Sequence, residues 1–74
     1  MKMMIESTTR IVKANGGIDC RVWEGVTERG VAVVVLVARI AVKEGQDVSQ
    51  FEAELKEARA PSKDAEVYPL RMVL

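Results

Sequence analysis

Two neighbouring stretches of the chain carry the pattern of β-strands. Between residues 18 and 27 the apolar side chains fall on even-numbered positions, at Ile18, Cys20, Val22 and Val26. The odd-numbered positions between them carry Asp19, Arg21, Trp23 and Gly25, which gives the period-two pattern of a half-buried strand. Residues 31–42 follow as a run dominated by valine and isoleucine, which fit a pleated surface better than a helix. The pattern therefore predicts strands over residues 18–27 and 31–42.

The segment Thr27-Glu28-Arg29-Gly30 predicts how these two strands pair. Gly30 stands where a type I turn followed by a bulge requires a residue in the left-handed region. This turn sets Thr27 opposite Val31 and so fixes the register of the whole hairpin. The predicted pairs are Val22–Leu36, Trp23–Val35, Cys20–Ala38, Ile18–Ile40 and Asp19–Arg39, the last of which joins opposite charges.

The first segment of the chain has two interpretations. Five residues have helical spacing, namely Met4, Ile5, Thr8, Ile11 and Val12, and Asn15-Gly16-Gly17 could cap such a helix. Residues 8–13 are nevertheless rich in β-branched side chains, and Asn-Gly is a hairpin signal. We favour a strand over residues 8–14, with the helix as the alternative.

A helix is predicted after residues 43–46. Either Asp47 with Gln50 or Ser49 with Glu52 forms a capping box, and Pro61 ends the helix near Ala60. Its apolar stripe consists of Val48, Phe51, Leu55 and Ala58. Residues 66–74 then alternate as a last strand, with Pro69 favouring an edge position or an irregular start.

These elements predict a single small α+β domain over residues 1–74. The order is β-β-β-α-β, with an antiparallel sheet and one helix packed on one face. We expect Phe51, Leu55 and Ala58 to cover the face that carries Ile18, Val22, Leu36 and Ile40, because that face is apolar on both strands apart from Glu24.

No predicted element packs on the opposite face of the predicted sheet. It carries Trp23, Val31, Val33, Val35 and Val37, with Arg21 and Arg39 at its charged end. A contiguous apolar patch of this kind marks an interface. We therefore predict a homo-oligomer, most simply a two-fold dimer, in which this face is buried. The alternative is an N-terminal helix that covers the same face within the monomer.

The amino-acid composition excludes several classes of function. The 74 residues are 49% apolar, with eleven basic and eleven acidic side chains, no histidine and one cysteine. A net charge of zero makes nucleic acid an unlikely partner. Without histidine or a second cysteine, we predict no catalytic residue, no metal site and no cofactor, and hence no enzyme. The longest apolar run, residues 31–38, is too short to span a membrane, and we expect a cytoplasmic protein without a signal peptide.

Two further functions remain open. Trp23 and Arg21 could form a stacking and basic surface for single-stranded nucleic acid. Glu24 shares a face with Val22, Val34 and Leu36, so it lies either at the margin of the sheet or buried with a partner. A cleft between subunits that holds Glu24 with other polar groups would indicate an enzyme site completed across an interface.

Several short segments together resemble a known kind of protein. They are residues 21–25 (RVWEG), 27–31 (TERGV), 39–42 (RIAV), 49–62 and 69–74. Over about residues 10–74 the chain resembles small uncharacterised proteins of phage and prophage gene sets. The resemblance implies an accessory phage protein involved in assembly or host interaction, and it transfers no catalytic residue.

Overall fold

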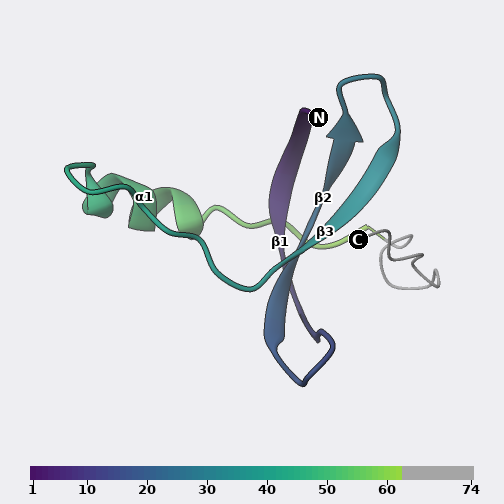
Figure 1. The fold of residues 1–74 in the computed structure, drawn as a ribbon, viewed down its shortest axis with the longest axis horizontal. Coiled ribbons are helices and arrows are strands. Elements are labelled where there is room, and N and C mark those ends of the chain that lie inside the picture. Colours follow the sequence, from purple (N-terminus) through teal and green to yellow (C-terminus); the bar gives the residue numbers. More distant parts are fainter. Residues whose placement is uncertain (63–74) are drawn as a thin grey trace.

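The computed structural model describes residues 1–62 as an antiparallel sheet followed by one helix (Figure 1). The strands are β1 (Met3–Lys13), β2 (Asp19–Thr27) and β3 (Ala32–Val37), arranged in the order β1-β2-β3, and the helix is α1 (Val48–Leu55). The predicted antiparallel α+β architecture is thus confirmed for these four elements. The strand predicted over residues 66–74 lies outside the described residues.

The N-terminal segment is a strand and not a helix. It begins at Met3, earlier than the predicted residue 8, and pairs with β2 through a hairpin at Asn15-Gly16-Gly17. Gly16 and Gly17 adopt φ values of 85° and 77°, which side chains other than glycine rarely tolerate. The backbone N–H of Ala14 donates to the carbonyl of Ile18 at 2.8 Å and closes the turn.

The predicted register of the second hairpin is confirmed in its central part. Val22 pairs with Leu36 and Trp23 with Val35. Gly30 has a φ of 86°, and the N–H of Thr27 donates to the carbonyl of Val31 at 2.9 Å. The turn chemistry alone was therefore enough to align these two strands.

The far end of that hairpin was predicted wrongly. β3 ends at Val37, opposite Arg21, and the chain bends at Ala38, so Arg39 never comes opposite Asp19. Instead Asp19 pairs with Lys13 of β1, whose ammonium lies 2.9 Å from the carboxylate. The strand stops early because the chain turns away here towards α1.

The register defines two faces of the sheet, since cross-strand partners point to the same side. We call one the Val22 face, which carries Val12, Cys20, Val22, Glu24, Val34 and Leu36. We call the other the Trp23 face, which carries Ile5, Arg21, Trp23, Val33, Val35 and Val37.

A bulge interrupts β1 in the middle of the sheet. Ser7 pairs with Trp23 and Ile11 with Arg21, so residues 8–10 stand opposite Val22 alone. The main-chain ladder is broken there, and the hydroxyl of Thr8 donates to the carbonyl of Val22 at 2.6 Å in its place. Thr8 is completely buried. A side chain therefore replaces a backbone donor at this point.

The helix starts as predicted and ends sooner. Asp47 is its N-cap, with the carboxylate accepting from the N–H of Gln50 at 3.0 Å. The helix stops at Leu55 because the following chain pairs with the bulged edge of β1: Thr9 donates to the carbonyl of Arg59 at 2.8 Å, and Arg59 donates to that of Ser7 at 3.2 Å. Outward-facing backbone groups of Ser7 and Thr9 thus pair with Arg59, and the Ser7 hydroxyl donates to the carbonyl of Glu57 at 3.2 Å.

The helix does not cover the Val22 face, contrary to expectation. Phe51 and Leu55 instead line a hollow with Trp23 and Val37 on the Trp23 face, and Figure 1 shows α1 standing to one side of the sheet. The bend at Ala38 leads the chain to this side, while residues 59–62 contact the Val22 face. No residue of α1 is buried.

Very little of the described chain is buried. Among residues 1–62 only Ser7, Thr8, Cys20 and Val22 are buried, and two of these are polar. Large apolar side chains such as Met4, Ile11 and Ile40 are exposed. The small core therefore sits around the β1 bulge, and most apolar surface of this part of the chain lies outside it.

Candidate interaction surface

The Trp23 face brings together five of the seven residues predicted to form an interface. Arg21, Trp23, Val33, Val35 and Val37 lie on it, and all five are half-buried. β2 and β3 hold them in two adjacent rows because alternate residues of a strand point to one side.

The other two predicted residues lie outside this cluster. Val31 precedes β3 next to the turn and is 60% exposed, while Arg39 follows the end of β3 and is exposed. Arg39 therefore does not form the charged end of the face as expected, and Arg21 alone of the predicted pair lies there.

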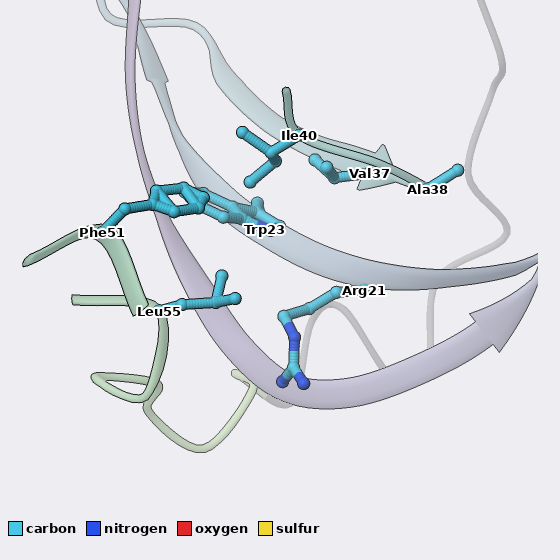
Figure 2. Close-up of a pocket in the computed structure, with 7 residues that line it drawn as sticks. All are labelled: Arg21, Trp23, Val37, Ala38, Ile40, Phe51 and Leu55. Atoms are coloured by element: carbon cyan, nitrogen blue, oxygen red, sulfur yellow. The ribbon is translucent and has the colours of Figure 1, made fainter. Parts of the chain in front are cut away.

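Helix α1 and the Trp23 face enclose a shallow hollow of about 200 Å³ (Figure 2). Its lining is mostly apolar and consists of Arg21, Trp23, Val37, Ala38, Ile40, Phe51 and Leu55. The helix thus shelters only the Arg21 end of the face. Val33 and Val35 lie farther along β3, and neither belongs to the hollow.

Arg21 is engaged in holding the β1 bulge. Its guanidinium donates to the carbonyl of Thr8 at 2.6 Å. The carbonyl of Thr8 has no ladder partner at the bulge, and the guanidinium of Arg21 takes that place. A hydrogen bond from a charged donor is stronger than one between neutral groups. The basic group of the proposed nucleic-acid surface therefore already has a structural role, which weakens that alternative.

Glu24 on the Val22 face holds the chain that follows α1. Its carboxylate accepts from the backbone N–H of Ser62 at 2.9 Å and from the Ser62 hydroxyl, and Arg59 lies 3.4 Å away. The side chain of Glu24 is only 12% exposed. Arg59 also contacts Glu6 at 3.7 Å. We call this contact set the Glu24 clasp: Glu24, Arg59 and Ser62.

The clasp accounts for Glu24 without catalysis. The hydrogen bonds from Ser62 lower the pKa of Glu24 below its usual 4.5, and the nearby Arg59 adds to this, against the opposing effect of burial. A carboxyl whose pKa is lowered stays ionised and accepts hydrogen bonds, whereas a general acid needs a raised pKa. Glu24 thus fits the expectation of burial with a partner, and the partner belongs to the same chain.

The clasp predicts a pH-dependent contribution to stability. Because the folded pKa of Glu24 lies below its unfolded value, its contribution is complete above about pH 4.5 and is lost as the pH falls through the folded pKa. We expect Glu24→Gln to cost about 1 kcal/mol at neutral pH, since exposed Arg59 and Ser62 leave the contacts screened by solvent. The variant should also flatten the stability profile below about pH 4.5, where Glu24 takes up its proton.

Urea unfolding at a series of pH values measures this effect. Glu6→Gln is the matched control, because Glu6 contacts the same arginine with a side chain that is 72% exposed. Equal losses for the two variants, or an unchanged acid profile for Glu24→Gln, would contradict the role of the clasp.

The candidates for chemistry among the described residues are one thiol and the acidic side chains. Cys20 is buried, with its sulfur 3.6 Å from the carbonyl of Ile18. Within residues 1–62 no three acidic, cysteine or histidine side chains gather as a metal site. No helix in this part of the chain combines the length and apolarity needed to cross a membrane.

Sequence reasoning missed three residues that organise the structure. Thr8, Arg59 and Ser62 bind backbone or carboxylate groups that only the folded chain brings near. The one available signal was Glu24, a charge on an otherwise apolar strand face, which indicates that a polar partner must come from elsewhere.

Comparison of the chain with protein-family models, with curated proteins and with solved structures finds no match.

Proposed function

We propose that this protein is a non-catalytic interaction or assembly module that acts as a homo-oligomer, most simply a dimer, through its Trp23 face. One observation carries the proposal: among residues 1–62 only Cys20 and Val22 are buried apolar residues, while a row of valines and Trp23 remains half-exposed. A domain this small gains much of its stability from covering such surface.

The alternative cover for the valine row, which consists of Val33, Val35 and Val37, was an N-terminal helix. The N-terminal segment is strand β1, so it does not cover this row within the monomer as a helix would. Helix α1 reaches only the hollow at the Arg21 end. A second copy, related by a two-fold axis, would cover the remaining valines with an equally apolar surface.

The resemblance to phage and prophage proteins suggests the setting. We propose an accessory role in phage assembly or host interaction, in which the oligomer presents its surface to another protein. Genes that neighbour the coding sequence test this directly, since a location outside any phage or prophage region would remove the proposal.

We expect Val35→Asp to convert the oligomer into a monomer. Val35 lies in the centre of the Trp23 face, opposite Trp23, and a carboxylate there would be buried without a partner. Light scattering coupled to size-exclusion chromatography measures the mass of wild type and variant at tens of micromolar. Circular dichroism shows whether the variant remains folded.

Val26→Asp is the matched control for that experiment. Val26 belongs to the neighbouring strand β2, is 44% exposed and points to the Val22 face, so the added charge should leave the oligomer intact. A monomeric wild type would end the proposal, as would a Val35→Asp variant that stays oligomeric. Oligonucleotide binding that weakens with salt and requires Trp23 would favour the nucleic-acid alternative.

A further inference from the structure

The two outer edges of the sheet, formed by β1 and β3, differ in how they are protected against pairing with another strand. The edge of β1 is protected by the bulge opposite Val22, by its pairing with Arg59, and by charged Glu6, Arg10 and Lys13. Natural sheets use such devices to prevent pairing with other chains. The edge of β3 has none of them: its sequence is Ala-Val-Val-Val-Leu-Val, without charge, proline or bulge.

The hydrogen-bond pattern shows which groups of β3 point outward. Thr27 and Val31 form a hydrogen-bonded pair, so the alternation of an antiparallel ladder directs Val33, Val35 and Val37 towards β2. The N–H and carbonyl groups of Ala32, Val34 and Leu36 consequently face away from β2. Within residues 1–62 no strand pairs with them.

We propose that this edge binds the β3 edge of a second copy, antiparallel about a two-fold axis through Val34. The inference rests on the proposed homo-oligomer and adds a second interface to it. Edge pairing sets two Trp23 faces side by side, and face-to-face packing against another such pair then covers them. In this register Val34 meets its own copy and Ala32 meets Leu36, which allows about six backbone hydrogen bonds. The two three-stranded sheets become one continuous sheet.

A second copy fits this edge because the strand is complementary to itself. Each outward amide of Ala32, Val34 and Leu36 meets an outward carbonyl under the two-fold operation. No like charges oppose one another, since Ala32–Val37 contains no charged residue. Val33 of one copy also comes beside Val35 of the other on the Trp23 face, so the two valine rows join into a single apolar surface.

Amide hydrogen exchange of the full chain tests the edge directly. We expect the amides of Ala32, Val34 and Leu36 to become protected as protein concentration rises, together with the growth in mass seen by light scattering. Protection that is independent of concentration would mean that another part of the same chain occupies the edge, and this would overturn the proposal.

Other outcomes separate this proposal from the proposed function. An oligomer whose three outward amides exchange freely would overturn edge pairing and leave association through the Trp23 face intact. A chain that is monomeric at every concentration would overturn both.

Val34→Pro gives an independent measurement. Proline removes an outward N–H that β2 does not use, whereas Val34→Ala trims the same side chain and keeps that donor. We expect the proline variant to dissociate about tenfold more readily than the alanine variant. Equal dissociation constants for the two would contradict backbone pairing, and the exchange data on wild type decide the matter if the proline variant does not fold.

Discussion

Gly25→Ala is expected to destabilise the protein by about 3 kcal/mol, the upper end of the range for overpacking. A β-carbon at Gly25 would lie 1.9 Å from the carbonyl oxygen of Met4 and 2.7 Å from the α-carbon of Ile5. Both are backbone atoms of β1, so the strand itself must shift to make room. A loss of this size is a large part of the roughly 5–15 kcal/mol that stabilises a typical domain.

Urea and thermal unfolding of the variant measure this loss. The φ of Gly25 is not positive, so the effect tests available space and not backbone conformation. Val26→Ala provides a comparison on the same strand at an exposed site, where we expect less than about 1 kcal/mol. A similarly small loss for Gly25→Ala would show that β1 and β2 do not approach as closely as described.

Local sequence signals predicted the four described elements and one register. The glycine of the second turn demanded a left-handed conformation, and that single requirement aligned Val22 with Leu36 across the hairpin. β-Branched residues likewise indicated that the first segment is a strand. Of the two predicted capping boxes, the one with Asp47 and Gln50 stands at the start of the helix. Each of these signals depends on residues close together in the chain.

The errors arose where distant segments meet. The strand was predicted to continue through Arg39 because its residues favour strands, but the chain bends at Ala38 to reach α1. Apolar periodicity identified the stripe with Phe51 and Leu55, yet periodicity says nothing about which sheet face a helix meets. The direction of the connecting loop decided that, and no local pattern encodes it.

The bulge in β1 links the predicted and the unpredicted parts of the structure. It breaks the ladder opposite Val22 and leaves a carbonyl that Arg21 caps, and Arg59 pairs with the outer edge of β1 beside it. Arg59 and Ser62 then reach Glu24. The chain after the helix therefore returns beside Thr8 and Thr9, which appear in the sequence only as an ordinary Thr-Thr pair in a strand.

The hydroxyl of Thr8 is the contact on which this arrangement depends most directly. It donates to the buried carbonyl of Val22 at 2.6 Å and lies 3.3 Å from the backbone N–H of Arg10, which donates to it. Removing the hydroxyl leaves the carbonyl of Val22 without this partner in a buried place, and the N–H of Arg10 without it in a half-buried one. An unsatisfied buried acceptor costs about 1–3 kcal/mol.

Thr8→Val should therefore destabilise the protein by about 2–3 kcal/mol although it preserves the shape of the side chain. Thr8→Ser keeps the oxygen and loses a methyl group, so we expect about 1 kcal/mol, the transfer free energy of one buried carbon. Denaturant unfolding of the two variants separates hydrogen bonding from packing. If the serine variant lost as much as the valine variant, the buried methyl group and not the hydroxyl would stabilise the bulge. If the ranking holds, the broken ladder of β1 is maintained by one side-chain oxygen, because an apolar replacement of equal volume cannot satisfy the carbonyl of Val22.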